Sequence, residues 1–132
     1  MTELTLAATT ENIGTVTAFV DEELEKLDCP IKAQMQIDVA IDELFSNIAF
    51  YAYENGGDAT VGFDFADGVV TLVFTDSGKP YDPTKKVDPD TTLSAEEREI
   101  GGLGIFLVKK TMDSIDYRYD GGKNILTIKK KI

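Results

Sequence analysis

Residues 42–53 read DELFSNIAFYAY, a stretch that combines the apolar pattern of a packed helix with two polar side chains inside it. Glu43 and Asn47 are four residues apart, so on a helix they project from one stripe. Leu44 and Ile48 flank that stripe with apolar side chains. Two interpretations are open: the pair belongs to the surface of an amphipathic helix, or it is partly buried and serves a site.

The apolar periodicity around this stretch predicts a helix over residues 31–53, preceded by an amphipathic helix over residues 11–27. A shorter helix is expected over residues 105–112. Strands are predicted over residues 4–8, 59–65, 69–75, 115–119 and 125–131. The order β-α-α-β-β-loop-α-β-β indicates an α+β fold, a two-layer sandwich in which helices cover one face of a mixed, mostly antiparallel sheet.

The composition limits the possible functions. A chain of 132 residues with 42% apolar residues fits one domain, residues 1–132. It has no histidine and one cysteine, which excludes disulfide scaffolds, His/Cys zinc sites and histidine-dependent nucleophiles. A net charge of -11 argues against direct nucleic-acid binding. The longest apolar stretch, residues 100–108, is too short to span a membrane, and no signal region is apparent, so we expect a cytoplasmic protein without membrane contact.

Two glycine-containing segments lie at the boundaries of predicted elements, one after a strand and one at the start of a helix. Residues 76–80, DSGKP, follow a strand and are typical of an ordinary turn. In a functional interpretation, the Asp76 carboxylate accepts from the adenine 6-amino group and repels the 6-oxo group of guanine, while Gly78 allows close approach of the backbone. Residues 101–104, GGLG, open a helix: they are either a hinge or packing site, or a cradle of backbone amides for phosphates.

The remaining chemistry would come from the polar pair and a long loop. The amide oxygen of Asn47 suits Mg²⁺, which takes few protein ligands and keeps its waters and the nucleotide phosphates. The carboxylate of Glu43 suits a base that orients or deprotonates a hydroxyl attacking the γ-phosphate. Residues 80–99 are rich in charge and proline, which predicts a mobile surface loop, and loops of this length in a small domain are usually functional lids or disordered.

In order and spacing, these motifs resemble those of the Bergerat-fold ATPases, the GHKL superfamily of gyrase B, histidine-kinase catalytic domains and anti-sigma-factor kinases. Residues 42–53 resemble the N box, residues 76–80 the first glycine box and residues 101–105 the second, so the resemblance covers essentially the whole chain. It implies an ATP site with Mg²⁺, Glu43 as catalytic base, Asn47 as metal ligand and residues 80–100 as the ATP lid. The nucleotide-binding residues that it implies are Asn47, Tyr51, Asp76, Gly78, Pro80, Gly101, Gly102, Leu103 and Gly104.

Within the superfamily, the chain is most similar to the small anti-sigma-factor serine/threonine kinases, which stand alone at about this length. That resemblance implies a homodimer that binds a sigma factor and phosphorylates a serine on an anti-anti-sigma protein of the STAS type. One departure is Tyr51, where the group usually has histidine, but Glu43 and Asn47 are present.

Two other functions are open. One is a nucleotide-responsive module of the same fold that sequesters a partner without useful catalysis. The other is a detached catalytic domain of a two-component sensor kinase, which would need a separate protein with a phosphoacceptor histidine. The presence of Glu43 favours the kinase, since binding alone needs no base.

Overall fold

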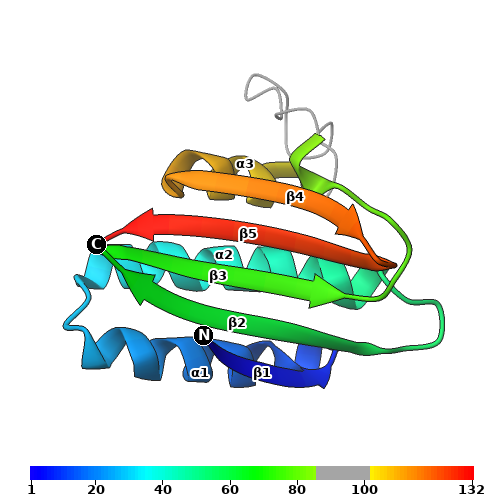
Figure 1. Cartoon of the computed structure of the whole chain (residues 1–132), viewed down its shortest axis with the longest axis horizontal. Helices are drawn as coiled ribbons and strands as arrows, with labels where there is room; N and C mark the ends of the chain where they lie inside the picture. Colours follow the sequence, from blue (N-terminus) through cyan, green and yellow to red (C-terminus); the bar gives the residue numbers. More distant parts are fainter. Residues whose placement is uncertain (86–101) are drawn as a thin grey trace.

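The computed structural model describes residues 1–85 and 102–132, and it has two layers, a sheet and three helices packed against one of its faces (Figure 1). The elements are β1 (Thr2–Ala7), the 3-10 turn η1 (Thr10–Asn12), α1 (Ile13–Lys26), α2 (Ile31–Tyr51), β2 (Asp58–Ala66), β3 (Val69–Asp76), the 3-10 turn η2 (Pro83–Lys85), α3 (Gly102–Thr111), β4 (Ser114–Asp120) and β5 (Lys123–Lys131). The predicted α+β sandwich is confirmed. Within the described ranges, no helix is long and apolar enough to cross a membrane.

The strands form one sheet in the order β1-β2-β3-β5-β4. Every neighbouring pair is antiparallel, so the sheet is antiparallel throughout rather than mixed. The reason is that β4 and β5 form a hairpin whose second strand, not its first, pairs with β3. The third helix begins at Gly102, three residues before the predicted start, because the glycine-rich run forms its first turn.

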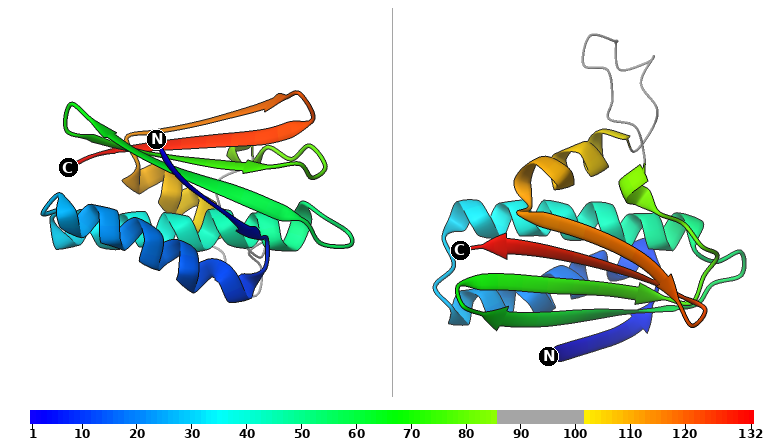
Figure 2. Two further views of the ribbon diagram at one scale, coloured as in Figure 1. Left: turned by 60° about the horizontal axis from the view of Figure 1, so that its bottom comes forward. Right: turned by 45° about the horizontal axis from the view of Figure 1, so that its top comes forward.

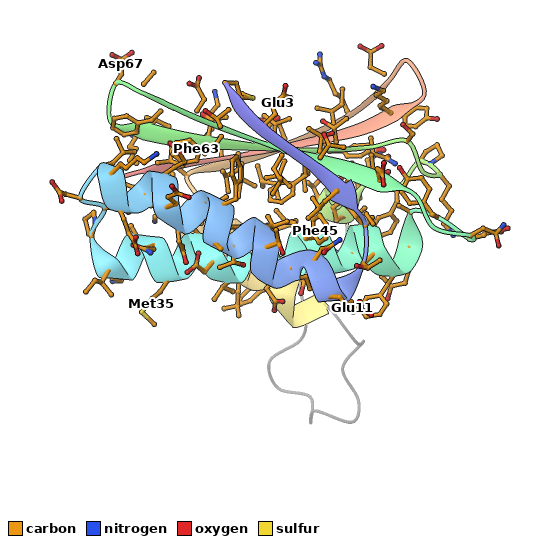
Figure 3. The ribbon with its side chains drawn as sticks, turned by 90° about the horizontal axis from the view of Figure 1, so that it is seen from below. Glu3, Glu11, Met35, Phe45, Phe63 and Asp67 are labelled. Carbon is orange, nitrogen blue, oxygen red and sulfur yellow. The ribbon has the colours of Figure 1, made fainter. Side chains whose placement is uncertain are left out.

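The core lies between the two layers. Figure 2 shows α1 and α2 side by side beneath the sheet, and Figure 3 shows Phe45 of α2 and Phe63 of β2 in the space between helices and strands. The buried apolar side chains of α1 recur every four residues, at Val16, Val20 and Leu24. The alternating inward residues of β2, β3 and β5 meet this stripe and that of α2. The period of four on the helices and of two on the strands therefore generates the sandwich.

The loop after β3 is fixed to the C-terminal end of α2. The backbone N–H of Lys79 donates to the carbonyl of Ala52 at 3.0 Å. A Cβ on Gly78 would lie 2.2 Å from that same carbonyl oxygen, so only glycine fits there. The Tyr53 hydroxyl accepts from the N–H of Ser77 at 2.8 Å and donates to the carbonyl of Asp58 at 2.7 Å. These contacts attach the predicted first glycine box to the predicted N box.

A pair of carboxyl groups lies between α1 and α2. Asp38 hydrogen-bonds to Asp21, and burial, that hydrogen bond and the charge of Asp21 raise the pKa of Asp38 to about 7. Burial is the main cause of the raised pKa of the Cys29 thiol, and the charges of Asp21 and Asp38 raise it further. Among the described residues, one oxygen of each carboxyl is buried without a hydrogen-bond partner. Asp38 therefore keeps its proton to a higher pH than an ordinary aspartate does.

The close contact at Gly78 predicts a large effect of one methyl group. Gly78→Ala should lower the free energy of unfolding in urea by about 1–3 kcal/mol, because the new methyl overlaps backbone that cannot move aside. Gly14→Ala is the matched control: it adds the same methyl to α1, where no atom lies within 4 Å, and should raise stability by up to about 1 kcal/mol. Equal effects of the two substitutions would show that the loop does not depend on this contact.

The carboxyl pair predicts a pH dependence of stability. In the unfolded chain an aspartate loses its proton near pH 4, whereas folded Asp38 keeps its proton up to about pH 7. Folding therefore takes up a proton between these values, so the contribution of Asp38 to stability falls as the pH rises from about 4 to 7. Asp38→Asn should raise stability at pH 8 by on the order of 1 kcal/mol, since solvent screens a partly exposed group, and should leave it little changed at pH 4.

Thermal unfolding of wild type and Asp38→Asn across this pH range checks the expectation. Asp64→Asn, which removes one charge from an exposed position of β2, controls for the change in net charge. An equal pH dependence of the unfolding temperature in Asp38→Asn and wild type would contradict the raised pKa of Asp38.

Candidate functional site

A cavity of about 40 Å³ lies between the C-terminal half of α2 and the ends of β3 and β5. Leu44, Phe74 and Leu126 form apolar parts of its wall. Three predicted site residues, Asn47, Tyr51 and Asp76, line it together. The structure thus brings the N box and the first glycine box to one cavity.

Asp76 is the buried acid of this cavity, with 6% of its surface exposed. Its Oδ1 accepts from the backbone N–H of Gly78 and from the side-chain Nδ2 of Asn124, both at 2.9 Å. Among the described residues, no hydrogen bond uses Oδ2. The carboxylate is therefore held through one oxygen, and the other oxygen is left for a donor that enters the cavity.

Asn47 presents an incompletely satisfied amide to the same cavity. Its Nδ2 is buried and has no hydrogen-bond partner among the described residues. Rotating the amide by half a turn exchanges its nitrogen and oxygen, so this position can present either a donor or an acceptor. A buried amide of this kind fits a polar ligand, and its oxygen fits Mg²⁺.

Glu43 lies one helical turn before Asn47 and contacts α3 rather than the cavity wall. A Cβ on Gly104 would lie 2.0 Å from Oε2 of Glu43. The absence of a side chain at Gly104 therefore lets the first turn of α3 come against the carboxylate. The structure brings the predicted base next to the predicted second glycine box, as a second cluster beside the cavity.

The other predicted residues are placed as follows. Gly78 is buried against α2, whereas Pro80 is exposed and does not line the cavity. Gly102 and Leu103 form the first turn of α3, and Gly101 lies outside the described residues. Of the predicted lid, residues 86–100 also lie outside the described ranges.

The described beginning of the predicted lid, residues 81–83, packs on the cavity. Pro83 is buried there, and the ring of Tyr81 lies 5.9 Å from that of Tyr51, centroid to centroid, with the planes 38° apart. This tilted pair is a favourable arrangement of aromatic rings, and it forms an aromatic edge of the cavity.

Sequence reasoning missed Asn124 and Tyr117. Asn124 is 7% exposed and lines the cavity. Its side chain hydrogen-bonds to Asp76, to the loop after β3 and to the Tyr117 hydroxyl. Burial is the main cause of the raised pKa of Tyr117, whose protonated hydroxyl donates to Asn124 Oδ1. A signal for Asn124 was available: it occupies the inward register of β5 together with Leu126 and Ile128, where a polar residue is exceptional.

The chain is similar to several proteins that are named serine or serine/threonine kinases. The serine-protein kinase RsbW of Halalkalibacterium halodurans is 27% identical in an alignment 124 residues long, which covers 91% of this chain and 76% of that protein. The serine/threonine-protein kinase BtrW of Bordetella bronchiseptica is 27% identical over 74% of this chain and 70% of its own. The RsbW of Listeria monocytogenes is 31% identical over 69% of this chain, but the match spans only 62% of that protein.

The structure of the Acinetobacter baumannii histidine kinase AdeS matches the fold with a TM-score of 0.58 over 99% of this chain and 68% of that chain, at 15% identity. The sequence profile of the histidine kinase-like ATPase domain matches residues 6–130. That span includes the three helices, the residues that line the cavity, strands β2, β3 and β4, and nearly all of β5. The chain belongs to the family of histidine kinase-like ATPase domains.

Proposed function

We propose that the protein binds Mg²⁺·ATP and transfers the γ-phosphate to a serine or threonine of a partner protein. The observation that carries the proposal is the buried Asp76 carboxylate, which is held through Oδ1 and offers Oδ2 in a cavity that Asn47 also lines. The kinase names of the relatives, at 27–31% identity, support the same reaction class.

Asp76 is the proposed determinant of base recognition. A carboxylate oxygen accepts from the 6-amino group of adenine, whereas the 6-oxo group of guanine would place a second acceptor against it. The burial of Asp76 makes this discrimination strong, because an unpaired charge in a poorly hydrated site is costly.

Asn47 and Glu43 have the proposed roles of metal ligand and base. The Asn47 amide oxygen would hold Mg²⁺, which when bound neutralises phosphate charge. Glu43, one turn away on the same rigid helix, takes the proton of the attacking hydroxyl. The first turn of α3, which meets Glu43 at Gly104, provides backbone amides for the phosphates.

For the protein partners, we propose a sigma factor and an anti-anti-sigma protein of the STAS type, bound by a homodimer. An exposed apolar groove supports partner binding in general. It is lined by Ile31, Met35 and Val39 of α2 and by Leu107 of α3, and Figure 3 shows Met35 pointing away from the sheet. Contiguous exposed apolar side chains are typical of interaction surfaces.

The same groove favours a second candidate function, a nucleotide-responsive module that sequesters a partner without catalysis. Such a module would use the cavity and the groove but would not need a base at Glu43. Phosphotransfer measurements separate the two candidates.

Base recognition predicts the behaviour of Asp76→Asn. Wild-type protein should bind ATP at least about tenfold more tightly than GTP, since one lost hydrogen bond to a charged group costs about 1.5–3 kcal/mol. Asp76→Asn should lose most of this preference because its amide can offer a donor to the guanine oxygen. Titration calorimetry with both nucleotides measures it, and Asp64→Asn on the exposed face of β2 is the control. Equal wild-type affinities for ATP and GTP would refute the role of Asp76.

Catalysis predicts different losses at Glu43 and Asn47. Glu43→Ala should still bind Mg²⁺·ATP but lose phosphotransfer to the partner serine by on the order of 10²-fold or more, because a positioned base is removed. Asn47→Ala should weaken binding of the metal-nucleotide complex itself. Transfer of labelled phosphate and nucleotide binding are measured in parallel.

The matched control is Glu25→Ala, which removes an exposed carboxylate from α1. Undiminished transfer by Glu43→Ala would exclude Glu43 as the base. An absence of transfer by wild type to any STAS-type protein would favour the sequestering module.

A further inference from the structure

The Asn124 side chain connects three separate parts of the site. Its Nδ2 donates to Asp76 Oδ1 and to the carbonyl of Lys79, each at 2.9 Å, with the Gly78 carbonyl at 3.4 Å. Its Oδ1 accepts from the backbone N–H of Tyr81 at 3.1 Å and from the Tyr117 hydroxyl. One buried amide thus reaches the end of β3, the loop after it and strand β4.

We propose that Asn124 is a positioning residue that sets the base selectivity of the cavity, by holding the Asp76 carboxylate and the loop of residues 78–81 in one arrangement. This inference rests on the proposed ATP-binding function. It concerns the protein's own contacts to Asp76, and so it assigns Asn124 no direct contact with the nucleotide.

The network fixes which way the amide points. Two donors, the N–H of Tyr81 and the hydroxyl of Tyr117, face Oδ1, and two acceptors, Asp76 Oδ1 and the Lys79 carbonyl, face Nδ2. The reversed amide would place donor against donor and oxygen against carboxylate. Asn124 therefore presents an N–H to Asp76 in a defined direction.

That direction decides which oxygen of Asp76 serves a ligand. With Nδ2 of Asn124 and the N–H of Gly78 both on Oδ1, the carboxylate cannot rotate without losing two hydrogen bonds, and Oδ2 stays available. Both side chains are more than nine-tenths buried, where hydrogen bonds to a charge are strong. Without the Asn124 donor, the carboxylate would lose its fixed orientation and with it the geometry that distinguishes the two purines.

Asn124→Asp tests this role with almost no change in shape. The new carboxylate keeps an acceptor for Tyr81 and Tyr117 but replaces the donor toward Asp76 by a second negative oxygen. Two carboxylates at hydrogen-bond distance do not both ionise readily, so they share a proton at low pH and repel at high pH. The shared proton restores the missing hydrogen bond.

The measurement is the dissociation constant for ATP and for GTP, with Mg²⁺, from pH 5.5 to 8.5. At pH 8 the variant should bind ATP at least about tenfold more weakly than wild type, with a reduced preference over GTP. At pH 5.5 both its affinity and its preference should return toward wild type. The other titratable groups that face this network are present in both proteins, so the wild-type profile accounts for them: Tyr51 of α2, Lys79, Tyr81 and Asp82 of the loop after β3, and Tyr117 and Tyr119 of β4.

Asn55→Asp, at an exposed position of the loop before β2, adds the same charge and should behave as wild type. If Asn124→Asp keeps wild-type selectivity at pH 8, or stays defective at pH 5.5 although folded, the positioning role is overturned. If the variant does not fold at pH 8, Tyr117→Phe replaces it. Loss of one donor to Asn124 Oδ1 loosens the amide and should lower the ATP preference several-fold, and an unchanged preference would overturn the inference.

Wild-type measurements separate this inference from the proposed function. A wild-type protein that binds neither nucleotide, or both equally, refutes the proposed ATP site and the inference with it. A wild-type protein that prefers ATP, beside variants that prefer it equally, refutes the role of Asn124 alone.

Discussion

The contact between Gly78 and the carbonyl of Ala52 is the constraint on which the site depends. The carbonyls at a helix end have no partners within the helix, and Ala52, the C-cap of α2, receives the N–H of Lys79 instead. Through this hydrogen bond the loop after β3 caps the C-terminal end of α2. A side chain on Gly78 would prevent the hydrogen bond because it would clash with the Ala52 carbonyl. The same approach places Asp76 against the cavity that Asn47 lines. The hydrogen bond from the N–H of Ser77 to the Tyr53 hydroxyl adds a second attachment between the same two motifs.

The burial of Asp76 explains how this one residue would determine the proposed base specificity. A buried carboxylate is costly unless it is hydrogen-bonded, and here two N–H groups satisfy one of its oxygens. A ligand that supplies a donor to the other oxygen completes the set, whereas one that supplies an acceptor leaves a desolvated charge unpaired. Such sites reject the wrong ligand more strongly than an apolar wall does, because the penalty falls on the protein's own buried group.

Local patterns in the sequence predicted the helices and strands. The contacts between distant residues depend on which strands pair, and the local patterns do not specify that pairing. The four-residue recurrence of Val16, Val20 and Leu24 and the alternation along β2, β3 and β5 were sufficient for helices, strands and layers. The Asp76–Asn124 contact was not predictable in this way, since it depends on the register in which β3 pairs with β5, where these two residues are direct neighbours. The all-antiparallel arrangement of the sheet depends on the same pairing of β3 with β5.

For the site as well, the residues of local motifs were predictable from the sequence, whereas the contacts between distant elements were not. Asn47 and Asp76 come from motifs of fixed local spacing, and the structure brings them to one cavity as expected. The contact of Glu43 with Gly104 joins two helices whose packing no local pattern specifies.

The helix α2 supplies a fixed distance between the two halves of the proposed chemistry. Its C-terminal end meets the loop that holds Asp76, and Glu43, nine residues before Ala52, meets the first turn of α3. At about 1.5 Å per residue, Glu43 and Ala52 are about 14 Å apart along the helix axis. A nucleotide bound with its base at Asp76 would therefore extend its phosphates along α2, past Asn47, toward Glu43. Because a packed helix does not change length, recognition of the base at one end would, in the proposed reaction, position the reacting phosphate at the other and so lower the entropic cost of the transfer.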